Sequence, residues 1–216
     1  MPPAFFAAPP PLVITDVDST LISQEVIEEL AHHAGSRNEV AAITARAMNG
    51  ELDFAQSLHA RVATLKGLPL SIFERVVDAV TPTVGAQLLI DEIHRHGGHF
   101  GVVSGGFEEV VGPLCQRMGI DHYVANRLEV SNGELTGRVL GDVVTAETKV
   151  EKVHEWAGLH GTDAAHVLAI GDGANDVPML KTAGLGVAFC AKPAVREDIS
   201  AHLNIARLDA VRACWA

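Results

Sequence analysis

The chain has 216 residues, of which 48% are hydrophobic, so it can bury one sizeable core and still hold a modest insertion. Its 16 basic and 27 acidic residues give a formal net charge of −11. This charge argues against nucleic acid or an anionic membrane as the main partner, because both bind clustered Lys and Arg. An anionic ligand must be held by a few local positive groups.

No apolar run is long enough to span a membrane, and residues 1–11 lack the charged start and long apolar stretch of a signal peptide. We therefore expect a cytoplasmic protein. Cys115, Cys190 and Cys214 are odd in number and widely spaced, which predicts reduced, mostly buried thiols and no disulfide.

The chain is expected to begin with a loose, proline-rich arm at residues 1–11, followed by a short buried strand at residues 12–15. From residue 23 to about residue 79 the pattern becomes helical, without a strand candidate. Gly35 can end the first helix, because glycine readily adopts a left-handed conformation. Further capping and turn signals, at Ser36, Ser71 and residues 49–50, predict a small helical bundle. Each of the two serines is followed three residues later by Glu, as in a capping box.

After Pro82 the predicted elements alternate between helix and strand, which indicates a parallel sheet. Residues 127–139 interrupt this rhythm with two short alternating runs around Asn132 and Gly133, the pattern of a small hairpin flap. The sheet is expected to close at its last predicted strand. The expected helices are 84–96, 107–118, 148–159 and 176–183, and the expected strands are 99–103, 122–125, 166–170 and 185–189.

The simplest architecture is an α/β fold with a doubly wound, Rossmann-like, mostly parallel sheet. Residues 1–22 and 80–216 would form this core domain, and residues 23–79 would be a helical cap inserted after the first strand. Open parallel sheets bind ligands at the carboxyl ends of their strands. We therefore expect the inserted cap to lie over those strand ends.

Acidic residues follow two of the predicted strands. Asp16 and Asp18 are two positions apart, so extended backbone turns both side chains to one side. Asp172 and Asp176 lie in a glycine-rich loop that can approach a ligand closely. Each group alone fits a turn or helix-cap carboxylate equally well.

Together, these four carboxylates would repel each other by several kcal/mol per close pair at an effective dielectric of about 20. A hard cation such as Mg²⁺ would neutralise them. We expect Asp16 and Asp172 to be side-chain ligands, Asp18 to contribute its backbone carbonyl, and Asp176 to support the site.

Ser104, Gly105 and Gly106 follow another strand, where a hydroxyl and unencumbered N–H groups can cradle a phosphate. Lys149 lies near the start of a helix, where the macrodipole disfavours a cation unless an anion is bound nearby. Taken alone, these residues fit an ordinary strand-to-helix turn and a surface lysine.

In this chain order, the motifs resemble the four motifs of the haloacid dehalogenase superfamily of phosphatases, over nearly the whole chain. The resemblance implies that Asp16 is a nucleophile that forms an aspartyl-phosphate and that Asp18 is the general acid and base. It also implies that Ser104 and Lys149 bind the phosphoryl group.

Within this superfamily, the details resemble phosphoserine phosphatases. The resemblance implies that Glu25 meets the substrate ammonium and Arg61 its carboxylate, with Met48 and Phe54 as apolar pocket walls. Gly105, Gly106 and Asn175 are further expected contacts of the substrate. The implied reaction is hydrolysis of O-phospho-L-serine, the last step of serine biosynthesis.

Other interpretations remain open at this point. Glu25 fits a first-turn helix carboxylate, Arg61 a solvated helix residue, and Met48 and Phe54 the core of a helical bundle. A phosphatase for another small metabolite, or a phosphotransferase with an acceptor such as homoserine, would use the same catalytic residues. A binding module without turnover would have no need of both Asp16 and Asp18. Whether the chain forms a homodimer is also open.

Overall fold

The computed structural model describes residues 6–48 and 50–215. A seven-stranded sheet runs through it in the order β4-β3-β2-β1-β5-β6-β7. Neighbouring strands pair in parallel, except for the antiparallel pair β3 and β4. The predicted α/β architecture with a mostly parallel sheet is therefore confirmed. The strands span Leu12–Thr15 (β1), His99–Phe107 (β2), His122–Ser131 (β3), Glu134–Leu140 (β4), Val167–Gly171 (β5), Leu185–Phe189 (β6) and Ala201–Leu203 (β7).

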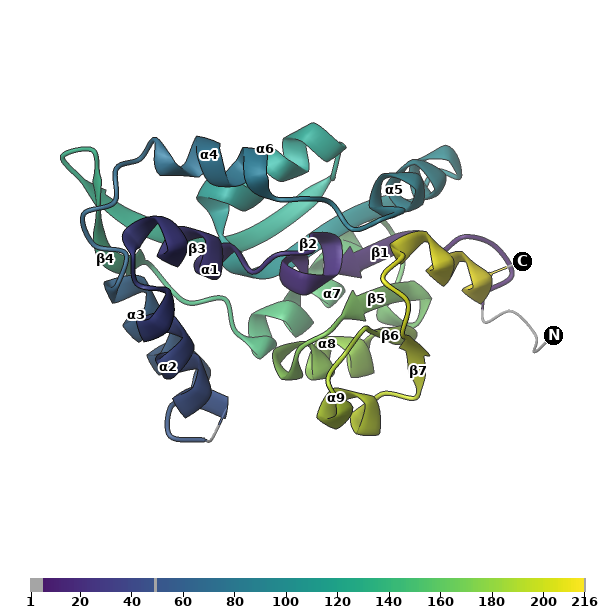
Figure 1. The fold of residues 1–216 in the computed structure, drawn as a ribbon. Helices are drawn as coiled ribbons and strands as arrows, with labels where there is room; N and C mark the ends of the chain where they lie inside the picture. The colour runs from purple at the N-terminus through teal and green to yellow at the C-terminus, as the bar shows by residue number, and fades with distance from the viewer. Residues whose placement is uncertain (1–5, 49, 216) are drawn as a thin grey trace.

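Helices cover both faces of the sheet, with α4, α5 and α6 above it and α7 and α8 below it in Figure 1. Two buried apolar clusters correspond to these layers, and alternate residues of β1 contribute to each. The helices span Val26–Ala34 (α1), Arg37–Met48 (α2), Phe54–Ala63 (α3), Ile72–Ala79 (α4), Ala86–Arg95 (α5), Glu108–Met118 (α6), Ala146–Leu159 (α7), Val177–Thr182 (α8) and Pro193–Asp198 (α9).

Four helices, α1 to α4, occupy the stretch predicted to be helical, and Gly35 ends α1 at φ 71°. The capping boxes predicted at Ser36 and Ser71 are wrong. The Ser36 hydroxyl lies 3.1 Å from that of Thr64, and Ser71 has a helical backbone that forms no side-chain cap. Of the turn expected at residues 49–50, Asn49 lies outside the described residues.

The predicted hairpin is confirmed, with both turn residues at positive φ: Asn132 at 52° and Gly133 at 81°. It continues directly from β3, so the central sheet extends outward toward the helical insertion. Its backbone reaches the loop between α3 and α4. There Gly67 N–H donates to Leu135 O at 2.9 Å, and Leu70 N–H donates to Gly133 O at 3.1 Å.

The ends of the chain differ from the prediction. The sheet does not close at β6, because α9, β7 and a 3₁₀ turn at Leu208–Cys214 follow. The expected loose arm is wrong from Phe6 onward, since Phe6 pairs with Trp215 and packs against the core. Residues 1–5 of that arm lie outside the described residues. Apolar burial at both ends outweighs the disordering tendency of the prolines.

The fold bears on the sequence expectations about membrane-spanning segments and thiols. No helix within the described ranges is long and apolar enough to cross a membrane. All three cysteines are free, as expected. Cys115 is buried and Cys214 is partly buried, but Cys190 is exposed, because it occupies a turn at φ 45° just after β6.

Candidate active site

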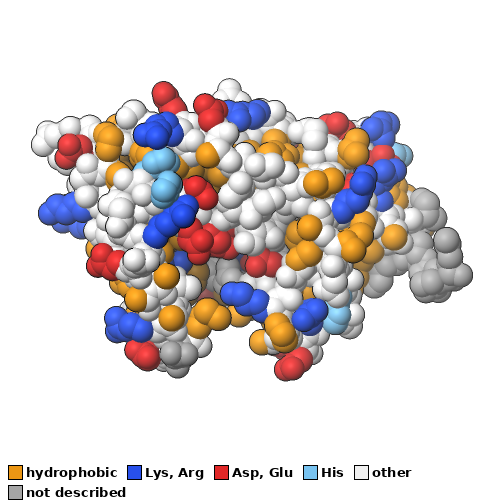
Figure 2. All heavy atoms as spheres, in the orientation of Figure 1, with side chains coloured by type: hydrophobic (Ala, Val, Ile, Leu, Met, Phe, Trp, Pro, Cys, Tyr) orange, Lys and Arg blue, Asp and Glu red, His pale blue; other side chains and the backbone are white. Residues whose placement is uncertain are grey.

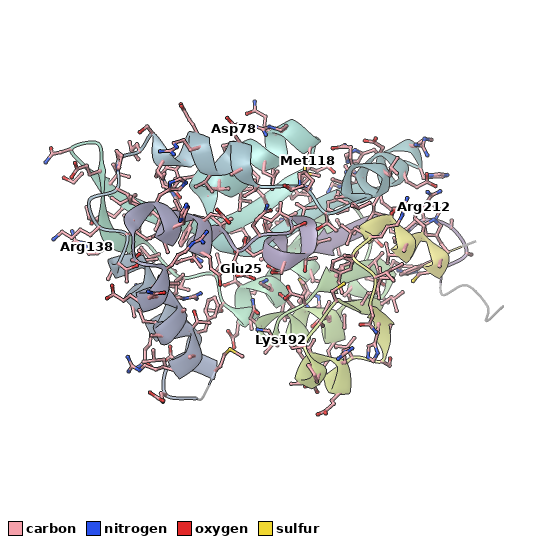
Figure 3. The ribbon with its side chains drawn as sticks, in the orientation of Figure 1. Glu25, Asp78, Met118, Arg138, Lys192 and Arg212 are labelled. Carbon is pink, nitrogen blue, oxygen red and sulfur yellow. The ribbon has the colours of Figure 1, made fainter. Side chains whose placement is uncertain are left out.

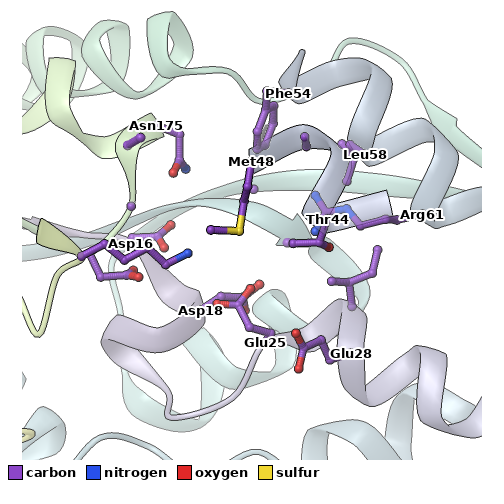
Figure 4. A pocket seen from close by; sticks show the side chains of 18 of the residues that line it. Asp16, Asp18, Glu25, Glu28, Thr44, Met48, Phe54, Leu58, Arg61 and Asn175 are labelled. Atoms are coloured by element: carbon purple, nitrogen blue, oxygen red, sulfur yellow. The ribbon is translucent and has the colours of Figure 1, made fainter. Parts of the chain in front are cut away.

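The carboxyl ends of β1, β2 and β5 open onto a cavity of about 690 Å³. Its walls come from the sheet, from the loop 172–175 after β5, from α9, and from the helical insertion α1 to α3. Figure 2 shows acidic side chains gathered in a hollow near the centre of this face, and Figure 4 shows the labelled side chains around the cavity. The cavity therefore lies at the strand ends, where a ligand was expected to bind.

At the floor of the cavity, Asp16, Lys149 and Asp176 form a buried ion-pair chain. Lys149 Nζ donates to Asp16 Oδ1 at 2.6 Å and to Asp176 Oδ1 at 2.5 Å. Lys149 is the fourth residue of α7, yet its side chain is only 1% exposed. The surface-lysine interpretation is therefore wrong, since the helix directs this cation at two carboxylates.

Burial and neighbouring charges together determine the pKa values of the ionisable groups at the floor of the cavity. Burial raises the pKa of Asp16 to about 8, although the neighbouring Lys149 opposes the change. Burial disfavours the charged form of Lys149, but Asp16 and Asp176 outweigh it and raise the pKa of Lys149. Burial and the charge of Asp176 also raise the pKa of Asp172, to about 6. Burial is the largest cause for both carboxyl groups, so a positive charge bound between them would lower these pKa values and stabilise the ionised forms.

The loop after β5 is organised by Asp176, which is completely buried. Its Oδ2 accepts hydrogen bonds from the N–H groups of Asp172, at 3.2 Å, and Gly173, at 2.9 Å. A Cβ on Gly171 would lie 2.6 Å from the Asp176 carboxyl carbon, so this position requires glycine. The glycine-rich sequence therefore has a packing reason as well as a ligand-binding one.

Asp18 lies in a tight turn, Val17–Leu21, in which Ser19 has φ 55°. Burial, then the charges of Glu25 and Asp16, raise the pKa of Asp18 well above its ordinary value. Its Oδ1 is buried without a hydrogen-bond partner among the described residues. Ser19 Oγ instead donates to Glu25 Oε1 at 2.7 Å, which fixes Glu25 close to Asp18.

Ser104 is fully buried near the end of β2, which runs on to Phe107 with an irregular register against β3. Its Oγ accepts a hydrogen bond from Gly106 N–H at 2.8 Å. A Cβ on Gly106 would come within 3.0 Å of that hydroxyl oxygen. The buried Asn126 completes the loop by donating to Gly105 O at 2.9 Å. Sequence reasoning assigned Asn126 no role, because its partner lies on another strand.

The helical insertion supplies the opposite wall of the cavity. Glu25, Met48, Phe54 and Arg61 all line it, as Figure 4 shows. Met48 is 68% exposed and Phe54 is 36% exposed, so neither belongs to a bundle core. Arg61 Nε donates to Ser57 O at 3.3 Å. Burial lowers the pKa of Arg61 despite the opposing charge of Glu25.

Asp16, Asp172 and Asp176 can each place one carboxylate oxygen within 4.8 Å of the others. This spacing, the raised pKa values of Asp16 and Asp172, and the all-oxygen donor set fit a hard divalent cation. Thr20 Oγ1 also donates to Asp172 Oδ1 at 3.1 Å and orients that carboxylate. The acidic residues expected around one cation are therefore close together in the structure.

A family model for haloacid dehalogenase-like hydrolases matches residues 13–181. The chain belongs to this family. It is 55% identical over 185 residues to a phosphoserine phosphatase of Streptococcus thermophilus, covering 86% of both chains. It is 45% identical to a phosphoserine phosphatase of Methanocaldococcus jannaschii, covering 86% of this chain and 88% of that one.

Solved structures give the same result for the fold of this hydrolase. A phospho-aspartyl intermediate analogue of phosphoserine phosphatase superimposes with a TM-score of 0.89 and 40% identity, covering 96% of this chain and 99% of that chain. A substrate-bound phosphoserine phosphatase complex has the same TM-score, identity and coverage.

Several residues around the cavity of this family member were not singled out in the sequence. Glu28 and Thr44 line it from the helical insertion, and Lys192 lines it from the start of α9. Thr20, which donates a hydrogen bond to Asp172, was also given no role. Their neighbours are distant in the chain, and no local pattern marks them, so only the fold could reveal their position.

Proposed function

We propose that this protein hydrolyses O-phospho-L-serine to L-serine and phosphate through a phosphorylated Asp16, with Mg²⁺ as cofactor. The observation that carries the proposal is the cavity itself. A buried carboxylate bound to a lysine lies at its floor, and a carboxylate and a guanidinium, Glu25 and Arg61, line the facing wall. The phosphoserine phosphatases among its relatives support this choice of substrate.

Asp16 is the nucleophile. Lys149 donates a hydrogen bond to its Oδ1, and the Asp16 side chain accepts no second hydrogen bond among the described residues. Its other oxygen is free to attack phosphorus. The ammonium of Lys149 spreads the negative charge that develops during the in-line transfer.

Asp18 is the general acid and base. Because its pKa is well above the ordinary value, it holds a proton that it can give to the departing serine oxygen. The resulting carboxylate then takes a proton from the water that attacks the aspartyl-phosphate. The unpaired Oδ1 of Asp18 is consistent with a group kept available for substrate.

The phosphoryl group is held by Ser104, Gly105, Lys149 and Asn175, while Gly106, expected to be a further contact, orients the Ser104 hydroxyl through its N–H. Since Ser104 Oγ already accepts from Gly106 N–H, its own hydroxyl hydrogen remains available to the phosphate. Asn175 lines the same cavity on the core side (Figure 4).

Asp16 and Asp172 would hold the cation by their side chains and Asp18 by its backbone carbonyl, while Asp176 holds the loop and Lys149 in place. The cation supplies Lewis-acid polarisation of the phosphoryl oxygens when it is bound. Asp176 is better suited to support than to ligation, because Lys149, Asp172 and Gly173 already use its two oxygens.

The serine part of the substrate is recognised by the helical wall. Glu25 pairs with the ammonium, Arg61 grips the carboxylate with its planar guanidinium, and Met48 and Phe54 exclude water. Residues 23–79 thus act as a cap that completes the site of a core formed by residues 1–22 and 80–216.

Phosphate release in the presence of Mg²⁺ tests this substrate assignment, with O-phosphoserine, O-phosphothreonine and a sugar phosphate compared and no acceptor alcohol added. We expect the highest kcat/KM for O-phosphoserine. Replacing Arg61 by Gln should raise KM for O-phosphoserine about ten- to a hundredfold, because a charged hydrogen bond is lost. It should leave p-nitrophenyl phosphate hydrolysis nearly unchanged.

The matched control is Arg46→Gln, which alters an exposed cap arginine paired with Glu51 and outside the cavity. It should leave both substrates unaffected. A preference for the sugar phosphate, or turnover that requires an added alcohol acceptor, would contradict the proposal.

A further inference from the structure

The cavity is strongly acidic for a site that has to admit a dianion. Only Arg61 and Lys192 contribute positive side chains to its described lining. The whole chain adds to this repulsion with a net charge of −11. Like charges at a cleft slow the approach of an anion unless a local cation offsets them. The acidic lining residues are Asp16, Asp18, Glu25, Glu28 and Asp172.

The positive groups deeper in the site are not placed to meet an approaching ligand. Lys149 is buried and bound to both Asp16 and Asp176. Arg61 is partly buried on the cap wall, close to Glu25. Lys192 differs from both, because it is exposed at the cavity and its ammonium forms no ion pair or hydrogen bond within the described residues.

Three of the five lysines of the chain are paired with acidic residues, and Lys192 and Lys66 are not, in the part of the chain that the structure describes. Lys152 pairs with Glu155, and Lys181 pairs with Asp198, in each case at 2.5 Å. Lys66 is also exposed and unpaired in the described structure, but it lies outside the cavity. The unpaired state of Lys192 therefore coincides with the place where a positive charge is scarce.

The backbone holds Lys192 in a defined position. Two residues before it, the N–H of Cys190 donates to Leu203 O at 2.8 Å. Directly after it, Pro193 begins α9. Ala191 and Val195, on either side of it, are buried. Figure 3 labels Lys192 at this end of α9, with Glu25 at the start of α1. The backbone of residues 190–195 therefore fixes the position from which the Lys192 side chain extends at the cavity.

We propose that Lys192 captures the phosphoryl group of the incoming phosphomonoester at the mouth of the cavity, before the group reaches Asp16. This inference rests on the proposed function and deepens it. Lys192 offsets the acidic lining and raises the rate of productive encounter. It does not take part in bond making, so its effect belongs to KM and kcat/KM.

The test compares Lys192→Gln, Lys192→Arg and the control Lys66→Gln, which removes the same charge outside the cavity. With O-phosphoserine and with p-nitrophenyl phosphate at low salt, Lys192→Gln should raise KM about three- to tenfold and change kcat less than about twofold. The difference from wild type should shrink at about 0.5 M salt, where screening acts within a few ångströms. Lys192→Arg should restore KM, and Lys66→Gln should resemble wild type.

A fall in kcat at unchanged KM, an effect independent of salt, or an equal effect of Lys66→Gln would overturn the capture role. Calorimetric titration with inorganic phosphate and Mg²⁺ separates this result from the substrate assignment. If wild type does not hydrolyse O-phosphoserine, the proposed function fails, while weaker phosphate binding by Lys192→Gln still supports capture. If wild type hydrolyses O-phosphoserine but Lys192→Gln matches it in both KM and phosphate affinity, only the capture role fails.

Discussion

Asp16 and Asp18 are two positions apart in the sequence but have different surroundings. Asp16 contacts the ammonium of Lys149 directly. Asp18 is partly buried beside the carboxylates of Glu25 and Asp16, and burial of its carboxyl group, then these two charges, raise its pKa. A carboxylate that contacts a cation suits the nucleophile, and one surrounded by negative charge suits the proton donor.

Replacing Asp18 by Asn keeps the shape of the side chain but removes the proton that it can give. We expect kcat for O-phosphoserine to fall about a hundred- to ten-thousandfold, the usual range for a lost general acid. KM should change little. A substrate with a better leaving group, such as p-nitrophenyl phosphate, should lose less. Equal losses for both substrates would argue against the acid role.

Residues beside predicted strand ends were easier to predict than their partners. Asp16, Asp18 and Asp172 follow from the rule that parallel sheets bind ligands at one edge. The burial of Lys149 between two carboxylates did not follow, because helix position alone suggests a surface residue. Asn126 and Lys192 carried no local signal. Asn126 contacts the Gly105 carbonyl, and Lys192 lines a cavity whose other walls come from segments distant in the chain.

At the scale of elements, β6 and α8 pack so closely that glycine is required between them. A Cβ on Gly186 in β6 would lie 2.1 Å from the carbonyl oxygen of Leu180 in α8. The clash is with backbone, so it cannot be relieved by turning a side chain. Gly158 in α7 is the opposite case, because it is exposed and has open space around its Cβ position.

These two glycines should respond to alanine with opposite signs. Gly186→Ala should lower the free energy of unfolding by about 1–3 kcal/mol or more, because the packed layers must separate. Gly158→Ala should raise it by about 0.5–1 kcal/mol, the usual gain in a helix. Urea unfolding followed by circular dichroism measures both. A stabilised Gly186→Ala variant would show that this close packing is misjudged.

Hydrophobic patterns indicated most of the helices and strands, and Asn132 with Gly133 indicated the hairpin. The two elements after β6 were missed. α9 has one buried residue, Val195, and β7 has none, so neither contains the buried apolar run that indicated β1 and β5. The capping boxes failed at Ser36 and Ser71 and formed instead at Asp53 and Thr145, because tertiary contacts decide which side chain is free to cap.

At the scale of the whole molecule, the fold concentrates carboxylates where the proposed reaction needs a cation. The sheet brings Asp16 and Asp172 together from strands that are neighbours in space but far apart in sequence. The helical insertion then places Glu25 and Arg61 opposite them. The mostly parallel sheet and the helical segment after β1 were predictable from sequence patterns, but the strand order was not. The depth of the cavity and its acidic excess required the structure.

Detection of the phosphorylated enzyme tests the central claim most directly. Wild type and Asp16→Asn, mixed with O-phosphoserine and Mg²⁺ and quenched in acid during turnover, are digested and examined by mass spectrometry. We predict a phosphoryl group on the wild-type peptide that contains Asp16, and neither label nor phosphate release from a folded Asp16→Asn variant. A phosphoryl group on another residue, or near-normal turnover by Asp16→Asn, would contradict the account.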